Sequence, residues 1–128
     1  MSKKQTHHQR AEAELTKYAL SFPETDVAPG WNVTRYLRVR GKGFAVFGDK
    51  DEPLDALTIV VKLPISAEMA RTLPFVRESK GWYKQHDWVI AHFGPNDDIW
   101  AEMETLKGWL KQSYIAMAPR KLAKALAP

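Results

Sequence analysis

The hydrophobic positions at the start of the chain repeat with the period of a helix. Apolar side chains recur at helical spacing from Ala11 to Phe22, and Pro23 ends the pattern because proline cannot continue a helix. This repeat predicts an amphipathic helix. Residues 23–32 contain two prolines and Gly30, which predicts a loop with Trp31 as its hydrophobic anchor.

From Val33 the period changes to two, because apolar and polar side chains alternate as far as residue 40 and predict a strand. Gly41, Lys42 and Gly43 then predict a hairpin turn, since glycine adopts the positive φ angles that tight connections need. Residues 44–47 predict the returning strand. After a turn at residues 48–55, the β-branched run at 57–62 predicts a third strand, so we expect an antiparallel meander.

The second half of the chain predicts two further strands and three helices. Ser66 is a candidate N-cap for a short helix that ends before Pro74. Residues 75–79 and 88–93 predict strands, and the aromatic-rich stretch 82–87 leads into the second of them. A long helix is expected from residues 96–97 to Met117, with acids at its start and lysines toward its end. A short terminal helix follows Pro119.

Apart from the short terminal helix, these elements follow the order α-β-β-β-α-β-β-α. No repeat, low-complexity tract or linker divides them, so we expect a single α+β domain over residues 9–128 after a flexible segment, 1–8. An antiparallel sheet with this order buries helices against one face, and the other face needs a separate explanation. We expect Trp88 and Met103 to be largely buried.

Composition is that of a globular, intracellular protein. The chain has 128 residues, 45% hydrophobic and 27% charged, with no apolar run of the ~18 residues that span a bilayer. Its N-terminus is polar and lacks the apolar stretch of a signal peptide, so we expect a cytoplasmic protein with no membrane partner. The absence of cysteine excludes disulfides, thiolate metal sites and cysteine nucleophiles.

Patterns typical of catalytic or metal centres are scarce. The glycine-rich phosphate loops and the Gly-x-Ser-x-Gly elbow do not occur. His86, Asp87 and His92 could bind zinc in principle, but we interpret both imidazoles as ordinary strand and surface histidines. The acids of the 48–55 turn lack the spacing of a calcium loop and are interpreted as solvated charge: Asp49, Asp51, Glu52 and Asp55. We expect no metal, no cofactor and no enzymatic activity.

The combination of basic and aromatic residues is more informative. The net charge is +4, and its cations cluster on the predicted hairpin and around the 80–88 stretch. Aromatic rings can stack on bases while neighbouring cations meet phosphates, although the same rings can equally be core anchors. The candidate nucleic-acid-binding residues are Arg38, Arg40, Lys42, Lys80, Trp82 and Lys84.

Several segments in series carry a family resemblance that covers most of the chain. They read LSFPET at residues 20–25, LRVRGKGFAVF at 37–47, VVKL at 60–63, GW at 81–82, WV at 88–89, SY at 113–114 and APRKL at 118–122. Together they resemble the MmcQ/YjbR family. The resemblance implies a YjbR-like, secretion-chaperone-like α+β fold and a DNA-binding function, and it brings no catalytic residues.

The residues and the resemblance leave two functions open. The first is a non-enzymatic, sequence-tolerant protein that holds the backbone of double-stranded DNA with the six residues named above. The alternative is a module that binds a protein or small-molecule ligand on an aromatic-lined face of the sheet. The two differ in salt dependence, because phosphate contacts weaken steeply with salt whereas contacts in an apolar groove do not.

Overall fold

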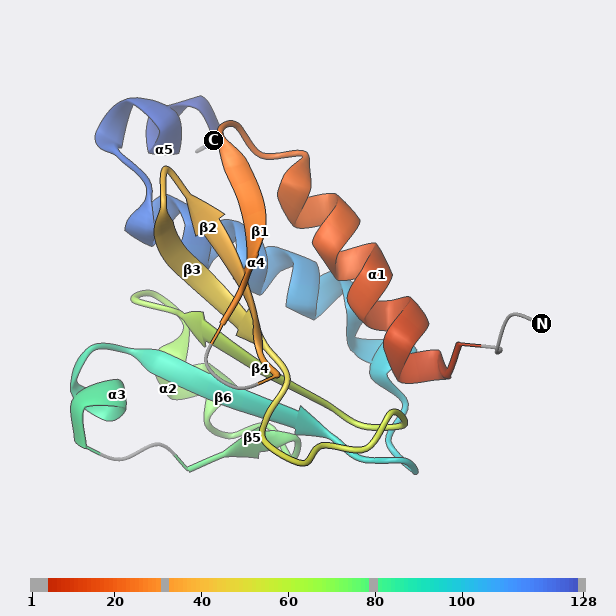
Figure 1. Ribbon diagram of the computed structural model, residues 1–128. Coiled ribbons are helices and arrows are strands. Elements are labelled where there is room, and N and C mark those ends of the chain that lie inside the picture. Colours follow the sequence, from red (N-terminus) through yellow and green to blue (C-terminus); the bar gives the residue numbers. More distant parts are fainter. Residues whose placement is uncertain (1–4, 31–32, 79–80, 127–128) are drawn as a thin grey trace.

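The computed structural model describes residues 5–30, 33–78 and 81–126. The strands are β1 (Thr25–Pro29), β2 (Arg35–Val39), β3 (Lys42–Phe47), β4 (Leu57–Lys62), β5 (Val76–Arg77) and β6 (Trp88–Phe93). The helices are α1 (His7–Leu20), α2 (Ala67–Ala70), α3 (Gly81–Gln85), the 3-10 turn η1 (Ile99–Glu102), α4 (Met103–Met117) and α5 (Arg120–Leu126). The strands form one antiparallel sheet in the order β1-β2-β3-β4-β6-β5, and α1 and α4 cover one of its faces (Figure 1).

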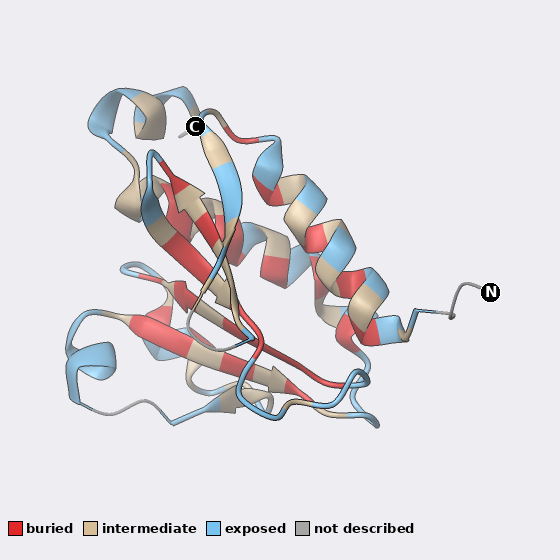
Figure 2. Ribbon diagram, viewed as in Figure 1, coloured by how far each residue is buried: buried red, intermediate tan, exposed pale blue. Residues whose placement is uncertain are grey.

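The predicted α+β class and antiparallel sheet are confirmed, and the predicted order of elements is largely correct. The structure contains β1 and α3, which were not predicted, and the start of the predicted long helix is the separate 3-10 turn η1. Buried residues are concentrated on the strands and on α1 and α4, whereas α3 and α5 have none (Figure 2). No helix in the described ranges has the length and apolar character needed to cross a bilayer.

Helix α1 begins at His7, one turn before the first apolar residue of the repeat, so His7 and His8 of the segment predicted to be flexible are helical. The reason is a capping box. The side chain of Thr6 accepts a hydrogen bond from the backbone N–H of Gln9, and the Gln9 side chain accepts one from the N–H of Thr6. Residues 1–4 lie outside the described residues.

The loop predicted for residues 23–32 is wrong in its centre, where β1 pairs with β2 along the edge of the sheet. Two prolines in the segment argued against a strand. Pro29, however, is the last residue of an edge strand, a position where its missing N–H removes no ladder hydrogen bond. Trp31, the predicted anchor of the loop, lies outside the described residues.

The hairpin between β2 and β3 turns one residue earlier than predicted. Arg40 and Gly41 have φ angles of 47° and 78°, which is the pattern of a two-residue turn with both central residues left-handed. Lys42 therefore belongs to β3. The register then shifts: Leu37 pairs with Ala45 but Arg38 pairs with Gly43, so Phe44 is the extra residue of a bulge.

The core is aromatic where α1, β3 and α4 meet. The ring of Tyr114 is fully buried, with centroids 5.0 Å from Phe22 and 5.5 Å from Phe44. Trp88 and Met103, predicted to be buried, are each only 9% exposed, which confirms that expectation. The cluster of Phe22, Phe44 and Tyr114 fixes α4 against the middle of the sheet.

Ser113 joins α4 to the sheet at the Phe44 bulge. Its buried hydroxyl accepts a hydrogen bond from the backbone N–H of Lys62 at 2.9 Å and donates one to the carbonyl of Phe44. A side chain of α4 thus bridges two strands where the bulge separates their backbones. The bridge satisfies two polar groups that would otherwise be buried without partners.

Candidate functional site

The sheet face opposite α1 and α4 carries a continuous row of apolar side chains. Tyr36 pairs with Val46, Val46 with Val60, and Val60 with Ile90, so one residue from each of four adjacent strands lies side by side. All four are half-buried, whereas the residues on either side of Val46, Val60 and Ile90 along the strands are buried in the core. Because side chains alternate between the faces of a strand, this row belongs to the face that α1 and α4 leave uncovered.

Helix α3 forms a wall beside this row. It replaces the irregular stretch expected before β6, and it starts at Gly81, whose φ of 58° favours glycine. Trp82 is 59% exposed and stacks on the buried Trp88 with ring centroids 6.3 Å apart and planes 23° apart. A hydrogen bond from Arg71 to the carbonyl of Lys84 ties α3 to α2.

Together these elements enclose a groove of about 460 Å³. We call it the sheet-face groove, and its apolar lining comes from Tyr36, Val46, Val60, Ile90, Trp82, Tyr83 and Trp88. Asp49 and Thr58 are among the polar residues that line it. Sequence reasoning foresaw an aromatic-lined sheet face as the alternative, and of the six predicted nucleic-acid-binding residues Trp82 is one that lines this groove.

Two of the six predicted site residues have carboxylate partners. Arg38 donates two hydrogen bonds, at 2.8 and 2.9 Å, to the carboxylate of Asp26 on β1. Arg40 donates two, both at 2.9 Å, to Glu24 just before β1. These bidentate pairs are on the surface, and they neutralise the charge that was predicted to meet phosphates.

The other predicted site residues are distributed over two elements. Lys42 is exposed at the start of β3, Trp82 and Lys84 are exposed on α3, and Lys80 lies outside the described residues. Trp82 therefore lines the sheet-face groove, while Arg38, Arg40 and Lys42 gather at the hairpin end of the sheet. The structure leaves their binding to DNA untested.

The ion pairs predict how stability depends on pH. Hydrogen bonds from Arg40 and Arg38 hold the pKa values of Glu24 and Asp26 below their usual ranges. A carboxylate with a lowered folded-state pKa stabilises the fold above its unfolded pKa, and that contribution is lost as pH falls through the folded pKa.

We expect an E24Q/D26N variant to lose less stability than the native protein between about pH 7 and about pH 3 in urea unfolding. Equal losses would contradict this, and Glu104→Gln serves as the control.

One acidic residue of the 48–55 turn is not solvated loop charge. The carboxylate of Glu52 accepts the backbone N–H of Thr58 at 2.9 Å and also its hydroxyl, and Thr58 Oγ1 lies 3.0 Å from Nδ1 of His92. Thr58 is only 4% exposed, so its hydroxyl serves to hold the turn on β4 and is poorly placed as a nucleophile. The carboxylate of Glu52, the hydroxyl of Thr58 and the imidazole of His92 are therefore joined to one another by hydrogen bonds.

The two histidines considered for zinc occupy different environments. His92 bonds to Thr58 within the sheet, and His86 lies beyond α3 with its ring 4.7 Å from that of Trp82. Within residues 5–30, 33–78 and 81–126, no three or more histidine, cysteine or acidic side chains are grouped so that they could hold a metal ion.

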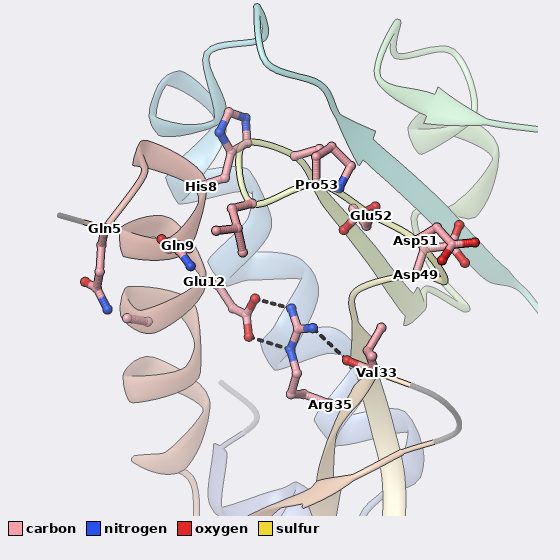
Figure 3. Close-up of a pocket in the computed structure, with 13 residues that line it drawn as sticks. Gln5, His8, Gln9, Glu12, Val33, Arg35, Asp49, Asp51, Glu52 and Pro53 are labelled. Atoms are coloured by element: carbon pink, nitrogen blue, oxygen red, sulfur yellow. Dashed lines mark hydrogen bonds and ion pairs between the residues drawn. The ribbon is translucent and has the colours of Figure 1, made fainter. Parts of the chain in front are cut away.

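A second cavity of about 620 Å³ lies between the N-terminal half of α1 and the turn before β4 (Figure 3). Arg35 crosses it, donating to the carboxylate of Glu12 and, at 2.8 Å, to the carbonyl of Val33. Its central charges therefore satisfy each other, and polar and apolar side chains both line it. The sheet-face groove offers more apolar surface and is the better candidate for a ligand site.

The comparisons with known proteins leave the family open. No protein-family model matches this chain, and no curated protein matches its sequence. The resemblance to the MmcQ/YjbR family therefore stays a prediction.

Proposed function

We propose that this protein is a non-enzymatic binding module that holds a flat, apolar small molecule in the sheet-face groove. The observation that carries this proposal is the half-buried row Tyr36, Val46, Val60 and Ile90, which lies open beside the exposed rings of α3. A volume of about 460 Å³ is within the range typical of small-molecule sites. The cytoplasmic location expected from the sequence stays a prediction.

The energetics favour a planar aromatic occupant. Trp82 and Tyr83 are 59% and 47% exposed, so a ligand that covers their rings removes apolar surface from water at about 25 cal/mol per Å². Offset or edge-to-face contact between rings adds about 0.5–1.5 kcal/mol per pair. The stack of Trp82 on Trp88 holds the wall in position, which lowers the ordering cost of binding.

Binding of double-stranded DNA is the competing proposal, and exposed Lys84 beside Trp82 is the arrangement that favours it. Phosphates at the hairpin would have to displace Asp26 from Arg38 and Glu24 from Arg40, two bidentate contacts. The apolar groove requires no such exchange. We therefore place the small-molecule module first.

The groove is tested with naphthamide, a neutral planar probe, by titration calorimetry. We expect binding that changes little with salt, because no ion pair is formed. Trp82→Ala should weaken it roughly 10- to 100-fold, since loss of one stacking ring costs about 1–3 kcal/mol. Trp100→Ala removes a comparably exposed ring on η1, outside the groove lining, and should leave the affinity unchanged. Equal effects of the two variants, or no binding to the native protein, would refute the proposal.

A labelled duplex measured by fluorescence anisotropy at several salt concentrations tests the alternative. Under our proposal the native protein shows no salt-dependent duplex binding. If it does bind, and the combined Arg38→Ala, Arg40→Ala and Lys42→Ala variant flattens the slope of log affinity against log salt by up to about 0.9 per phosphate contact, DNA binding replaces the small-molecule module.

A further inference from the structure

A second row of side chains crosses the uncovered sheet face next to the apolar row. Arg38 lies two residues from Tyr36 and is paired with Gly43 on β3. Lys62 lies two residues from Val60 and is paired with Trp88 on β6. Because alternate residues share a face, Arg38 and Lys62 both project from the face that carries the sheet-face groove.

Gly43 leaves a gap between these two cations. It lines the sheet-face groove, and a Cβ atom built on it would have one neighbour within 4 Å, Cδ2 of Tyr36 at 3.9 Å. The Ser113 hydroxyl, which bonds to Lys62 N–H and to the Phe44 carbonyl, joins β3 to β4 beside this glycine. The ladder between β3 and β4 ends at the pair of Ala45 and Val61, and β3, which carries Gly43, lies between the strands of Arg38 and Lys62.

The charges around the gap are unbalanced. Arg38 has the carboxylate of Asp26 as its partner. Lys62 is half-buried on an inner strand beside Trp88, and within the described ranges no ion pair joins it to a carboxylate. A cation that is partly withdrawn from water and lacks a counter-charge gains most from an anion that approaches over the gap.

We propose that the sheet-face groove selects aromatic carboxylates, with the ring on the Tyr36, Val46, Val60 and Ile90 row and the carboxylate over Gly43 beside Lys62. The proposal rests on the proposed function, since the ring must first occupy the groove. Arg38 projects from the same face on β2, but its guanidinium already has the carboxylate of Asp26 as its partner. The carboxylate thereby gives a bound ligand one orientation in an otherwise apolar site.

The test compares naphthoate with naphthamide, which share the ring system and differ in charge. In calorimetry at low salt we expect the native protein to bind naphthoate about tenfold more tightly, the effect of one charge-assisted contact, and the preference to shrink at high salt. Lys62→Met should abolish the preference and leave naphthamide binding intact, which also shows that the variant folds. Lys50→Met, on the turn before β4, should keep the preference.

The outcomes separate this inference from the proposed function. Equal affinities of the native protein for the two probes would overturn the carboxylate subsite while the binding module stands. A preference for naphthoate that survives in Lys62→Met would overturn it as well, because the anion would then be held elsewhere. No binding of either probe to the native protein would remove the proposed function and this inference with it.

Discussion

Replacement of Tyr114 by alanine is expected to lower the free energy of unfolding by about 3–5 kcal/mol. The side chain is fully buried and its ring contacts those of Phe22 and Phe44, so truncation leaves a cavity where α1, β3 and α4 meet. Small domains are stable by only about 5–15 kcal/mol, and the loss is a large part of that. Urea unfolding followed by circular dichroism measures it.

Tyr114→Phe is the matched control. It keeps the ring and removes only the hydroxyl, which donates a 2.8 Å hydrogen bond to the carbonyl of Pro23. The expected cost is about 1 kcal/mol. If Tyr114→Ala cost no more than Tyr114→Phe, the aromatic cluster would not be the main contact between α4 and the rest of the core.

Ser113→Ala is expected to cost about 1–3 kcal/mol, a large effect for the loss of one oxygen atom. The hydroxyl is the partner of both the Lys62 N–H and the Phe44 carbonyl, so its removal leaves two buried backbone groups unsatisfied. Ser21→Ala provides the comparison, because the Ser21 hydroxyl bonds to the Tyr18 carbonyl on the exposed surface and its loss should cost under about 0.5 kcal/mol. Similar unfolding free energies for the two variants would show that the β3–β4 bridge contributes nothing.

The period of the hydrophobic pattern predicted the inner strands well. Their side chains are buried on one or both faces of the sheet, so apolar residues occur at the spacing of a strand. The edge strand β1 was missed for a physical reason: residues 25–29 are mostly exposed or half-buried, so their pattern carries little trace of the sheet. Helix α3 was missed similarly, since none of its residues is buried.

The missed strand also explains why the predicted site differed from the one described. Asp26 and Glu24 were assigned to a loop, so nothing in the sequence indicated that they face Arg38 and Arg40. Cations that look free in a sequence acquire counter-charges once the neighbouring strand is placed. The aromatic sheet face could be foreseen as an alternative, because the predicted helices covered one face of the sheet and left the other face without an explanation.

The composition of β1 has a consequence for how the protein behaves in concentrated solution. The backbone groups of Glu24 and Gly30 form hydrogen bonds with the chain of β2. In an antiparallel pair these groups alternate in direction, so the backbone N–H and C=O groups that point outward from the sheet edge belong to Thr25, Val27 and Pro29. Proline offers no N–H, and the opposite edge, β5, is two residues long. Neither edge gives a second chain a long ladder to extend, so we expect the protein to keep its apolar sheet face open to solvent without forming fibrils through its sheet edges.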